Sequence, residues 1–347
     1  MQVASQSLGR LDGASLMLPN VDLFTYMFLR KEALVSSQIE GTQSSFADLL
    51  LYESDQAPGV PVEDVEEVVN YVAALNHGIQ RLEEGFPLSL RLIKEMHSIL
   101  LQGVRGQEKL PGEFRRSQNW IGGTRPGTAL FVPPPADHVM ACMGALEKFF
   151  HNDPVATSPL VKAALSHVQF ETIHPFLDGN GRLGRLLVTL ILYAETVLRR
   201  PSLYLSLYFK ANRQQYYDLL QHVRLKGEWE AWLTFFLTAI KETSDQAVHT
   251  IETIQQLFHQ DEEKLLNHRH ASKSVVNVYR YMQKRPITTI AQCVKALGST
   301  VPTVTKAVEQ LIALNIVKQL TGQERNRLFS YAAYVQILSE GADPIIS

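Results

Sequence analysis

Cysteine is almost absent from this sequence, with two among 347 residues, Cys142 and Cys293. The two lie far apart in segments that we expect to be helical, and neither belongs to a pattern with metal-ligand spacing. These facts exclude a disulfide framework and a cysteine-based metal site. We expect both thiols to be reduced and buried.

Long apolar runs are also missing, because no uninterrupted stretch approaches the roughly 20 residues that cross a membrane. The N-terminal stretch MQVASQSLGRLDG lacks the basic-then-apolar form of a secretion signal. A net charge of −2 excludes a chain that binds nucleic acid over its whole surface. We therefore expect a cytoplasmic protein without a membrane partner.

The densest group of chemically useful residues is the stretch from His174 to Arg185, which reads HPFLDGNGRLGR. Pro175 disfavours helical geometry at His174, so a preceding helix should end there. Gly179 to Gly181 suit a turn with positive φ. From Arg182 onward apolar residues recur at helical spacing. The stretch is therefore predicted to be a loop that leads into the N-terminus of a helix.

Such a loop is suited to an anionic ligand that carries a cation. Backbone N–H groups at a helix N-terminus attract anions, and glycines let a phosphate approach the main chain. Arg182 and Arg185 share a helix face and can hold neighbouring phosphates. Asp178 is a hard oxygen ligand, suited to a Mg²⁺ that accompanies a polyphosphate. His174 can accept a proton from a hydroxyl near neutral pH.

Plainer structures fit parts of the same stretch. Asn-Gly and Asp-Gly pairs form hairpin turns, but no strand alternation follows them here. A calcium loop needs more carboxylates and a downstream bidentate Glu. Taken alone, His174 is as well explained as a structural histidine. Its position beside Asp178 and two spaced arginines favours a functional role.

The stretch resembles the signature of the Fic (Fido) adenylyltransferases, His-Pro-Phe-x-Asp-Gly-Asn-Gly-Arg-x-x-Arg. The resemblance implies that His174 deprotonates a Ser, Thr or Tyr hydroxyl of a target protein, which attacks the α-phosphate of ATP. It also implies that Asp178 holds Mg²⁺ and that Arg185 binds the γ-phosphate. The α- and β-phosphates are then bound by the turn and the arginine after it: Gly179, Asn180, Gly181 and Arg182.

A second motif, Ser-Ser-Gln-Ile-Glu-Gly, lies upstream, where Ser36 and Glu40 share one face of a predicted helix. From spacing alone, a polar helix end with Gly41 as its C-cap is the favoured interpretation. Ser-x-x-x-Glu-Gly, however, is similar to the inhibitory helix motif of many Fic proteins. The resemblance places that helix at about residues 22–41 and implies that Glu40 pairs with Arg185.

Residues 111–135 differ in character from the helical segments around them. Strand-like pieces at 119–121 and 129–132, separated by glycines and a proline, predict a β-hairpin with a long loop. A hairpin at this place resembles the flap of the family, along which a target segment lies as an added strand. The resemblance makes Trp120 and Ile121 the expected docking residues.

Asn212 opens a stretch Asn-Arg-x-x-Tyr-Tyr that is similar to one near the nucleotide base in Fic relatives. The resemblance implies a role in nucleotide binding for Asn212 and Tyr217. We interpret two other histidines, His97 and His167, as structural or supporting residues.

The C-terminal residues have the pattern of a winged helix-turn-helix. Residues 275–347 carry eight Lys or Arg and four Asp or Glu, so this part has a charge of +4. The charge is modest, and a protein-interacting unit is as compatible with it as a DNA-binding one. Three helices and two strands are predicted, at residues 275–282, 290–297, 302–314, 316–320 and 328–331.

We therefore expect a mainly α-helical fold, in which a helical Fic core carries a β-hairpin flap and a C-terminal winged helix-turn-helix. Residues 1–19 show no clear period and are expected to be loose. The predicted parts are an N-terminal helical region (1–86), a Fic catalytic domain (87–243), a connector helix (244–272) and a winged-helix domain (273–347).

The resemblance implies a protein adenylyltransferase that uses ATP and Mg²⁺, modifies a target protein and itself, and is held in check by Glu40. Two alternatives stay open: a nucleotide-sensing DNA-binding regulator, and a Fic-fold enzyme of another reaction, such as phosphotransfer or removal of AMP. The sequence does not name the target, and it leaves a homodimer open.

Overall fold

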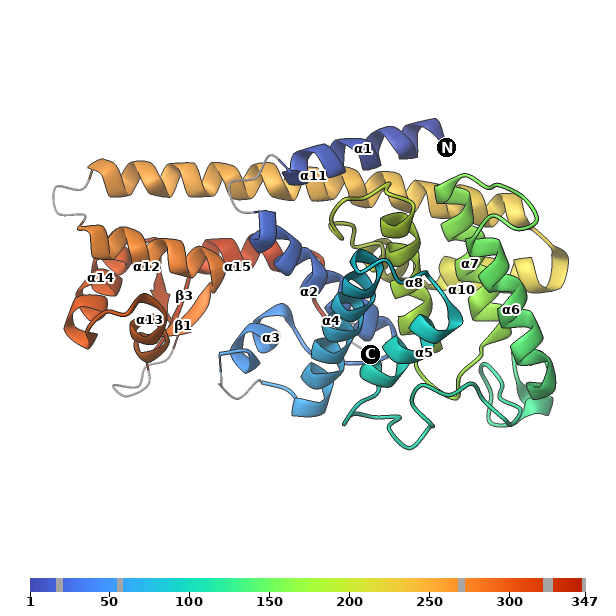
Figure 1. Cartoon of the computed structure of the whole chain (residues 1–347). Coiled ribbons are helices and arrows are strands. Elements are labelled where there is room, and N and C mark those ends of the chain that lie inside the picture. Colours follow the sequence, from blue (N-terminus) through green and yellow to red (C-terminus); the bar gives the residue numbers. More distant parts are fainter. Residues whose placement is uncertain (17–20, 55–58, 268–271, 321–326, 345–347) are drawn as a thin grey trace.

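The protein is built almost entirely of helices, as the sequence predicts (Figure 1). This computed structural model describes residues 1–16, 21–54, 59–267, 272–320 and 327–344. Within these ranges no helix is long and apolar enough to cross a membrane. The helices, in chain order, are α1 (Gln2–Leu16), α2 (Val21–Ile39), α3 (Phe46–Tyr52), α4 (Val62–Glu83), α5 (Leu90–Leu100), α6 (Val139–Phe150), α7 (Pro159–Ile173), α8 (Asn180–Ala194), α9 (Ser206–Ala211), α10 (Arg213–Lys226), α11 (Trp229–Asn267), α12 (Lys273–Lys284), α13 (Ile290–Leu297), α14 (Val301–Ala313) and α15 (Ala332–Ser339).

Helices α7 and α8 pack side by side at the centre of the larger part of the molecule. Helix α8 is buried on nearly every side: its apolar residues pack into the core, and its arginines, Arg182 and Arg185, are buried as well. Helix α7 begins with Pro159 at its first position and ends before His174, as predicted. Helices α4 and α5 also contact α8. The buried apolar residues of α8 are Leu183, Leu186, Leu187, Val188, Leu190, Ile191 and Leu192.

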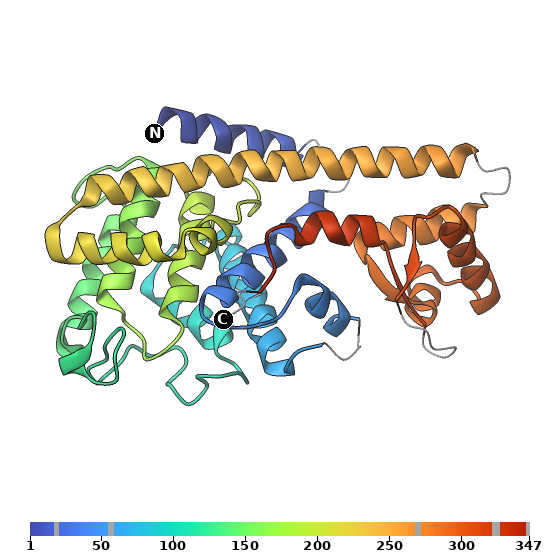
Figure 2. The same ribbon diagram turned by 180° about the vertical axis from the view of Figure 1, so that it is seen from behind.

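Helix α1 occupies residues that were expected to be loose, so that expectation was wrong. It packs along α11 (Figures 1 and 2). Asp12 on its buried face accepts hydrogen bonds from the backbone N–H (2.8 Å) and Nε (2.9 Å) of Arg199. Because half of the buried face is polar, its apolar period is weak. The residues of that face are Ala4, Ser7, Leu8, Leu11, Asp12 and Ser15.

Helix α11 is longer than the connector that was predicted for 244–272. It runs without a break from Trp229 to Asn267 along the length of the molecule (Figure 1). No Gly or Pro interrupts the sequence between these residues, so nothing ends the helix near residue 243. Thr243 and Ser244 are buried and continue the packed face of the helix. Because both side chains are polar, the pattern of apolar residues does not include them.

Residues 273–320 and 327–339 form a smaller unit (Figure 1), in which α12, α13 and α14 are close to their predicted positions. Its antiparallel sheet has the order β1-β3-β2, with strands β1 (Ile287–Thr289), β2 (Lys318–Gln319) and β3 (Leu328–Ser330). Ser330 lies opposite both Ile287 and Lys318. The sequence analysis missed β1 and α15. Residues 321–326, between the two predicted strands, lie outside the described residues.

This smaller unit is in contact with the N-terminal region. The Gln292 amide donates a hydrogen bond to the Ser54 carbonyl (2.8 Å), and the Ser54 hydroxyl donates to the Ile287 carbonyl (3.0 Å). Helix α15 packs against α2, α3 and α11. The chain then returns toward α2, so its last described residues lie in the larger part of the molecule (Figures 1 and 2).

Candidate active site

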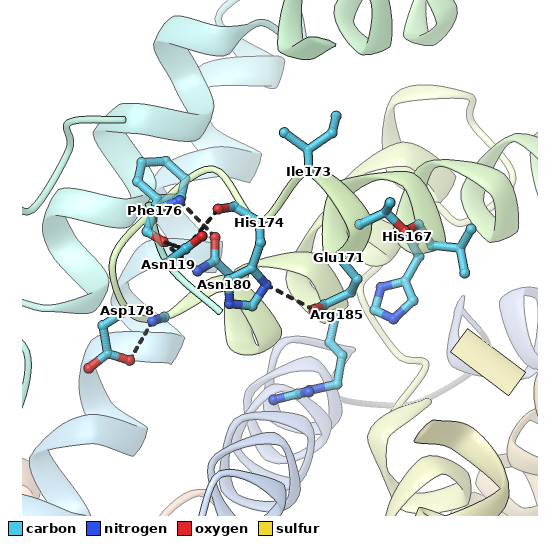
Figure 3. A network of polar contacts seen from close by, with 12 residues as sticks. Asn119, His167, Glu171, Ile173, His174, Phe176, Asp178, Asn180 and Arg185 are labelled. Carbon is cyan, nitrogen blue, oxygen red and sulfur yellow. Dashed lines mark hydrogen bonds and ion pairs between the residues drawn. The ribbon is translucent and has the colours of Figure 1, made fainter. Parts of the chain in front are cut away.

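The signature loop begins where α7 ends, at His174. His174 has a left-handed backbone conformation (φ 49°), which is uncommon for a residue other than glycine. Its carbonyl accepts hydrogen bonds from Nε of Arg115 (3.0 Å) and from the Asn119 amide (3.2 Å). Arg115 is itself buried and also donates to the Pro134 carbonyl (2.5 Å). These donors hold the unusual turn that places the His174 ring (Figure 3).

Asn180 closes the loop from its other end. The Asn180 Oδ1 accepts a hydrogen bond from the Phe176 N–H (2.9 Å), and Nδ2 donates to the Phe176 carbonyl (2.9 Å). The side chain is buried. The Asn180 side chain therefore shapes the loop, and the part of Asn180 that can face a phosphate is its main chain.

His97 supports the loop from α5. Its Nδ1 accepts a hydrogen bond from the Gly112 N–H (2.8 Å), so the neutral ring carries its proton on Nε2, which donates to the Asp178 carbonyl (3.0 Å). The ring is fully buried and stacks on Phe176 with centroids 3.7 Å apart. Burial lowers the pKa of His97 to about 4. The interpretation of His97 as a structural residue agrees with these contacts.

The guanidinium of Arg182 is buried and paired with Glu67 of α4. Nη1 of Arg182 lies 2.8 Å from Oε2 of Glu67, and the two side chains are 1% and 3% exposed. Asp178 is farther from Arg182, at 3.7 Å. The sequence analysis did not identify Glu67. Glu67 shares one face of α4 with the buried Tyr71 and Ala74. This position on an apolar face was the signal in the sequence that could have identified it.

Arg185 meets the end of α2, where both predicted inhibitory residues lie. Its Nε donates a hydrogen bond to Oγ of Ser36 (2.8 Å), and its Nη2 donates to the Ser36 carbonyl (3.0 Å) and to Oε1 of Glu40 (2.6 Å). Burial opposes a charge on Glu40, but the attraction of Arg185 outweighs it and lowers the pKa of the Glu40 carboxyl. The three residues form one charge-assisted group, in which Ser36 and Arg185 are buried and Glu40 is about one-third exposed.

Glu40 also lies directly over the N-terminus of α8. A Cβ on Gly181 would be 2.2 Å from Oε1 of Glu40, so position 181 must be glycine for the carboxylate to come this close. The Glu40 carboxylate therefore occupies the place where the first turn of α8 would bind an anion.

His174 lies beside a buried carboxyl group that the sequence analysis did not identify. Its Nδ1 is 3.8 Å from Oε2 of Glu171 (Figure 3). Burial lowers the pKa of His174 to about 4 and raises the pKa of Glu171 to about 7. His174 is therefore neutral at pH 7, which is the form that can accept a proton. Gly184 makes room for Glu171, because a Cβ there would be 2.8 Å from Oε1 of Glu171.

Asp178 lies at the exposed edge of the loop. Its Oδ1 accepts a hydrogen bond from the Gly179 N–H (2.6 Å), and 35% of its side chain is exposed. In the described part of the chain, no three His, Cys, Asp or Glu side chains form a metal-binding group. A cation at Asp178 would therefore take most of its ligands from a bound molecule or from water.

The predicted hairpin is present only in outline. Ile121 and Phe131 form an isolated antiparallel bridge, in which the Ile121 N–H donates to the Phe131 carbonyl (2.9 Å). A 3₁₀ helix at Pro126–Thr128 lies between the two pieces. The ladder is short because glycines and prolines interrupt this part of the sequence. Trp120 and Leu130 are 39% and 74% exposed. The bridge and its exposed apolar residues lie close to the loop, which Asn119 contacts.

The two residues expected at the nucleotide base have different surroundings. The Asn212 amide donates within its own helix turn, to the Tyr208 carbonyl (3.0 Å). Tyr217 is 39% exposed. Burial raises the pKa of the Tyr217 hydroxyl, and the charges of Glu40 and Arg185 also act on it, so Tyr217 lies within electrostatic reach of their pair.

The structure thus brings most of the predicted site residues together at the N-terminus of α8. Among the described residues, the side chain of Asn212 contacts its own helix turn and not this place. His167, interpreted as a supporting residue, is fully buried and bonded through Nε2 to the Tyr216 hydroxyl (2.8 Å). The predicted residues around the N-terminus of α8 are Ser36, Glu40, His174, Asp178, Gly179, Asn180, Gly181, Arg182, Arg185 and Tyr217.

Known proteins share both the sequence and the fold. The chain is 29% identical to the protein adenylyltransferase Fic of Aedes aegypti over 211 residues and 27% identical to that of Drosophila erecta over 210 residues. Each match covers 60% of this chain but only 39% of the relative. The chain therefore spans about two fifths of the length of these curated relatives.

Solved structures with a similar fold include a Fic family protein from Desulfovibrio desulfuricans G20. Its TM-score is 0.59 at 19% identity, and the match covers 94% of this chain and 95% of that one. Fic-1 from C. elegans matches with a TM-score of 0.56 at 23% identity, over 73% of each chain. At such identities the likeness shows the fold alone.

Family models match more than half of the sequence. Residues 1–80 match the model described as Fic/DOC family N-terminal, and residues 87–192 match the model described as Fic/DOC family. The second match includes the whole stretch from His174 to Arg185 that forms the site. The chain is a member of the Fic/DOC family.

Proposed function

We propose that this protein transfers AMP from ATP to a hydroxyl group of a target protein and of its own chain. The observation that carries the proposal is the juxtaposition of a neutral His174 with Arg185 and the N-terminus of α8. A base that accepts a proton at pH 7 and a site for phosphates are the two parts that such a transfer needs. The name of the curated relatives, protein adenylyltransferase, supports the same activity.

In the proposed reaction, His174 takes the proton of the target hydroxyl. The freed oxygen attacks the α-phosphorus of ATP and forms the new P–O bond. The bond from the α-phosphorus to the bridging oxygen breaks, and pyrophosphate leaves with the electron pair. Backbone N–H groups of the first turn of α8 stabilise the developing negative charge, while Arg185 holds the γ-phosphate.

Glu40 restrains this reaction in the proposal. Its carboxylate and the γ-phosphate would compete for Arg185, and the carboxylate also covers Gly181 at the helix N-terminus. ATP that binds beside a closed Glu40 has its γ-phosphate displaced, so its α-phosphate is turned away from in-line attack. The proposed resting state is therefore inhibited.

The proposed cation is Mg²⁺, and the residues present fit it. Oδ1 of Asp178 accepts the Gly179 N–H, while the side chain stays partly exposed and offers hard oxygens beside the phosphate site. Mg²⁺ is usually bound through one or two carboxylates together with substrate phosphates. When bound, it would neutralise phosphate charge.

The direct test is to incubate the Glu40→Gly variant with cell lysate and ATP and to identify modified proteins by mass spectrometry. A hydroxyl-bearing residue that gains AMP supports the proposal. Two results would contradict the proposal and indicate another reaction of the same fold. One is transfer of a phosphoryl group alone. The other is loss of AMP from a premodified protein while no protein gains AMP.

Asp178→Asn should raise the Mg²⁺ concentration that gives half-maximal transfer by about tenfold or more. The amide oxygen can still accept the Gly179 N–H, so the loop is kept while the charge is lost. Titrating Mg²⁺ against the initial transfer rate in the Glu40→Gly background measures this. Asp137→Asn, at an exposed carboxylate outside the site, should leave the titration unchanged. A normal titration for Asp178→Asn would mean that the cation is bound elsewhere.

Ile121→Pro should abolish labelling of a protein target and leave the affinity for ATP nearly unchanged. Proline has no N–H, so the bridge to the Phe131 carbonyl is lost and the strand-like edge with it. Ile121→Val keeps the N–H and should behave like the parent protein. Calorimetry measures ATP binding, and label transfer measures docking. Equal losses in both would show that this segment does not serve the target.

The C-terminal unit supports a second proposal, a winged helix-turn-helix that binds DNA. The observation that supports DNA binding is the charge of +4 over residues 275–347, together with the exposed Lys306 on α14. A gel-shift titration at several salt concentrations tests it, because phosphate contacts give a steep loss of affinity with salt. DNA binding together with no AMP transfer would favour the nucleotide-sensing regulator.

A further inference from the structure

Helix α2 is firmly anchored along most of its length. The buried Glu32 carboxylate accepts hydrogen bonds from the Ser206 N–H (3.0 Å) and the Tyr71 hydroxyl (3.2 Å). Two residues earlier, Nη2 of Arg30 lies 2.6 Å from Oε1 of Glu53. A movement of the whole helix would break these contacts. Release of Glu40 is therefore confined to the last turn of α2.

That last turn is in contact with the end of the chain. The amide of Gln38, two residues before Glu40, donates hydrogen bonds to the carbonyls of Ser44 (2.8 Å) and Ala342 (2.9 Å). Gln38 and Ala342 are both 1% exposed. Nζ of Lys210 donates to Oε1 of Gln38 (2.7 Å) and to the Asp343 carbonyl. Residues 304 positions apart in the sequence thus form one hydrogen-bonded group beside the inhibitory residue.

A single glycine gives the C-terminal segment its path. Gly341 follows α15 with a φ of +73°, and a Cβ there would be 3.2 Å from Cδ1 of Leu207. Both facts favour glycine at this position. The segment also borders an open cleft of about 420 Å³ beside Lys210, Arg213 and Gln246. Glu340, Gly341 and Asp343 are exposed on either side of the buried Ala342, so the segment can leave without passing through the core.

We propose that residues 340–344 are a latch that keeps the last turn of α2 in place and so holds Glu40 on Arg185. Release of this segment, by any partner that moves α15, would loosen the turn from outside the catalytic site. The proposal rests on the inhibition proposed above. It adds that the C-terminal unit controls this inhibition through one short segment.

Hydrogen exchange gives a readout that does not depend on catalysis. Three backbone N–H groups report on the turn, because those of Glu40 and Thr42 donate to the Ser37 carbonyl and that of Gly41 donates to the Gln38 carbonyl. The Ala342 N–H, which donates to the Ser339 carbonyl (2.9 Å), reports on the latch. Exchange at the two places shows whether they open together.

The test uses the full-length chain with Gly341→Val, which strains the left-handed turn and meets Leu207. Ala342→Arg, which puts a long cation in place of a buried methyl group, opens the same segment in a second way. We expect exchange at Ala342 and at residues 40–42 to become faster by at least about fivefold, in the usual range of coupling between sites. Gly298→Val is the matched control. Gly298 also has a positive φ (+58°), but no neighbouring atom lies within 4 Å of a Cβ there, so the turn should stay protected.

AMP transfer should rise about fivefold or more in both latch variants. In the Glu40→Gly background, adding either latch substitution should leave the rate of Glu40→Gly unchanged. The proposal is wrong if Ala342 exchanges faster while residues 40–42 stay protected, or if neither variant frees Ala342. It is also wrong if the latch variants speed transfer equally in the Glu40→Gly background. Faster exchange at both places without transfer in any variant would support the latch and count against the proposed activity.

Discussion

Glu40→Gly should transfer AMP at least about tenfold faster than the wild-type protein. The substitution removes the carboxylate 2.6 Å from Nη2 of Arg185 and clears the space over Gly181. Arg185 can then bind the γ-phosphate, and ATP can take the orientation needed for in-line attack. Initial rates of self-labelling with α-labelled ATP measure the effect.

The gain in rate should come with a loss of stability. Arg185 is almost fully buried, and in the described part of the chain its two hydrogen bonds to Ser36 remain when Glu40 is gone. Because Glu40 is about one-third exposed, we expect a loss of about 1–3 kcal/mol, below the cost of breaking a fully buried pair. Bound ATP should restore part of this, since a ligand of the folded state stabilises it.

Two further variants separate inhibition from other roles of Glu40. Glu40→Gln keeps the size of the side chain and removes its charge, so its transfer rate should lie between those of the wild-type protein and Glu40→Gly. Arg185→Ala should be slow with or without Glu40, because the γ-phosphate then has no anchor. If Glu40→Gly is no faster than wild type, while His174→Ala in that background is inactive, Glu40 is only the polar end of a helix.

His174→Ala should reduce transfer by about 10²–10⁴-fold in the Glu40→Gly background, the usual contribution of a general base. The side chain is 20% exposed and lies in a loop whose shape depends on the His174 carbonyl, and this substitution keeps that carbonyl. The fold and the affinity for ATP should therefore be retained. Circular dichroism and calorimetry check these two points, and label transfer gives the rate.

His222→Ala provides the matched control. His222 is 42% exposed and pairs with Glu228 on the surface, so its removal should leave the rate unchanged. A His174→Ala variant that labels its target near the parent rate would mean that another group accepts the proton.

The sequence predicts the signature loop well because its parts are neighbours in the chain. Helix α7 ends just before Pro175, and Gly179 caps α8 with a positive φ of 74°, as local backbone preferences predict. The positive-φ turn predicted over Gly179 to Gly181 was wrong for the other two residues, because Asn180 and Gly181 already belong to α8. The pairing of Glu40 with Arg185, 145 positions away, follows from family resemblance and not from local preference. Distant pairs without such a resemblance were missed.

Glu67 and Glu171 show why the remainder of the site could not be predicted. Both are acids on helices, which usually lie in water. Their burial depends on partners that the fold supplies: Arg182 for Glu67, and the space beside Gly184 for Glu171. Helix α1 was missed for a related reason, since Asp12 is buried against Arg199.

The Glu67–Arg182 pair also bears on how this protein can evolve. It joins the segment that matches the N-terminal family model to the segment that carries the signature. A recombination event between residues 80 and 87 that brings in a segment without an acid at position 67 would leave a buried arginine without this partner, at a cost of about 3–5 kcal/mol. That cost is a large part of the stability of an ordinary domain. A graft between relatives must therefore carry an acid at position 67 together with the loop.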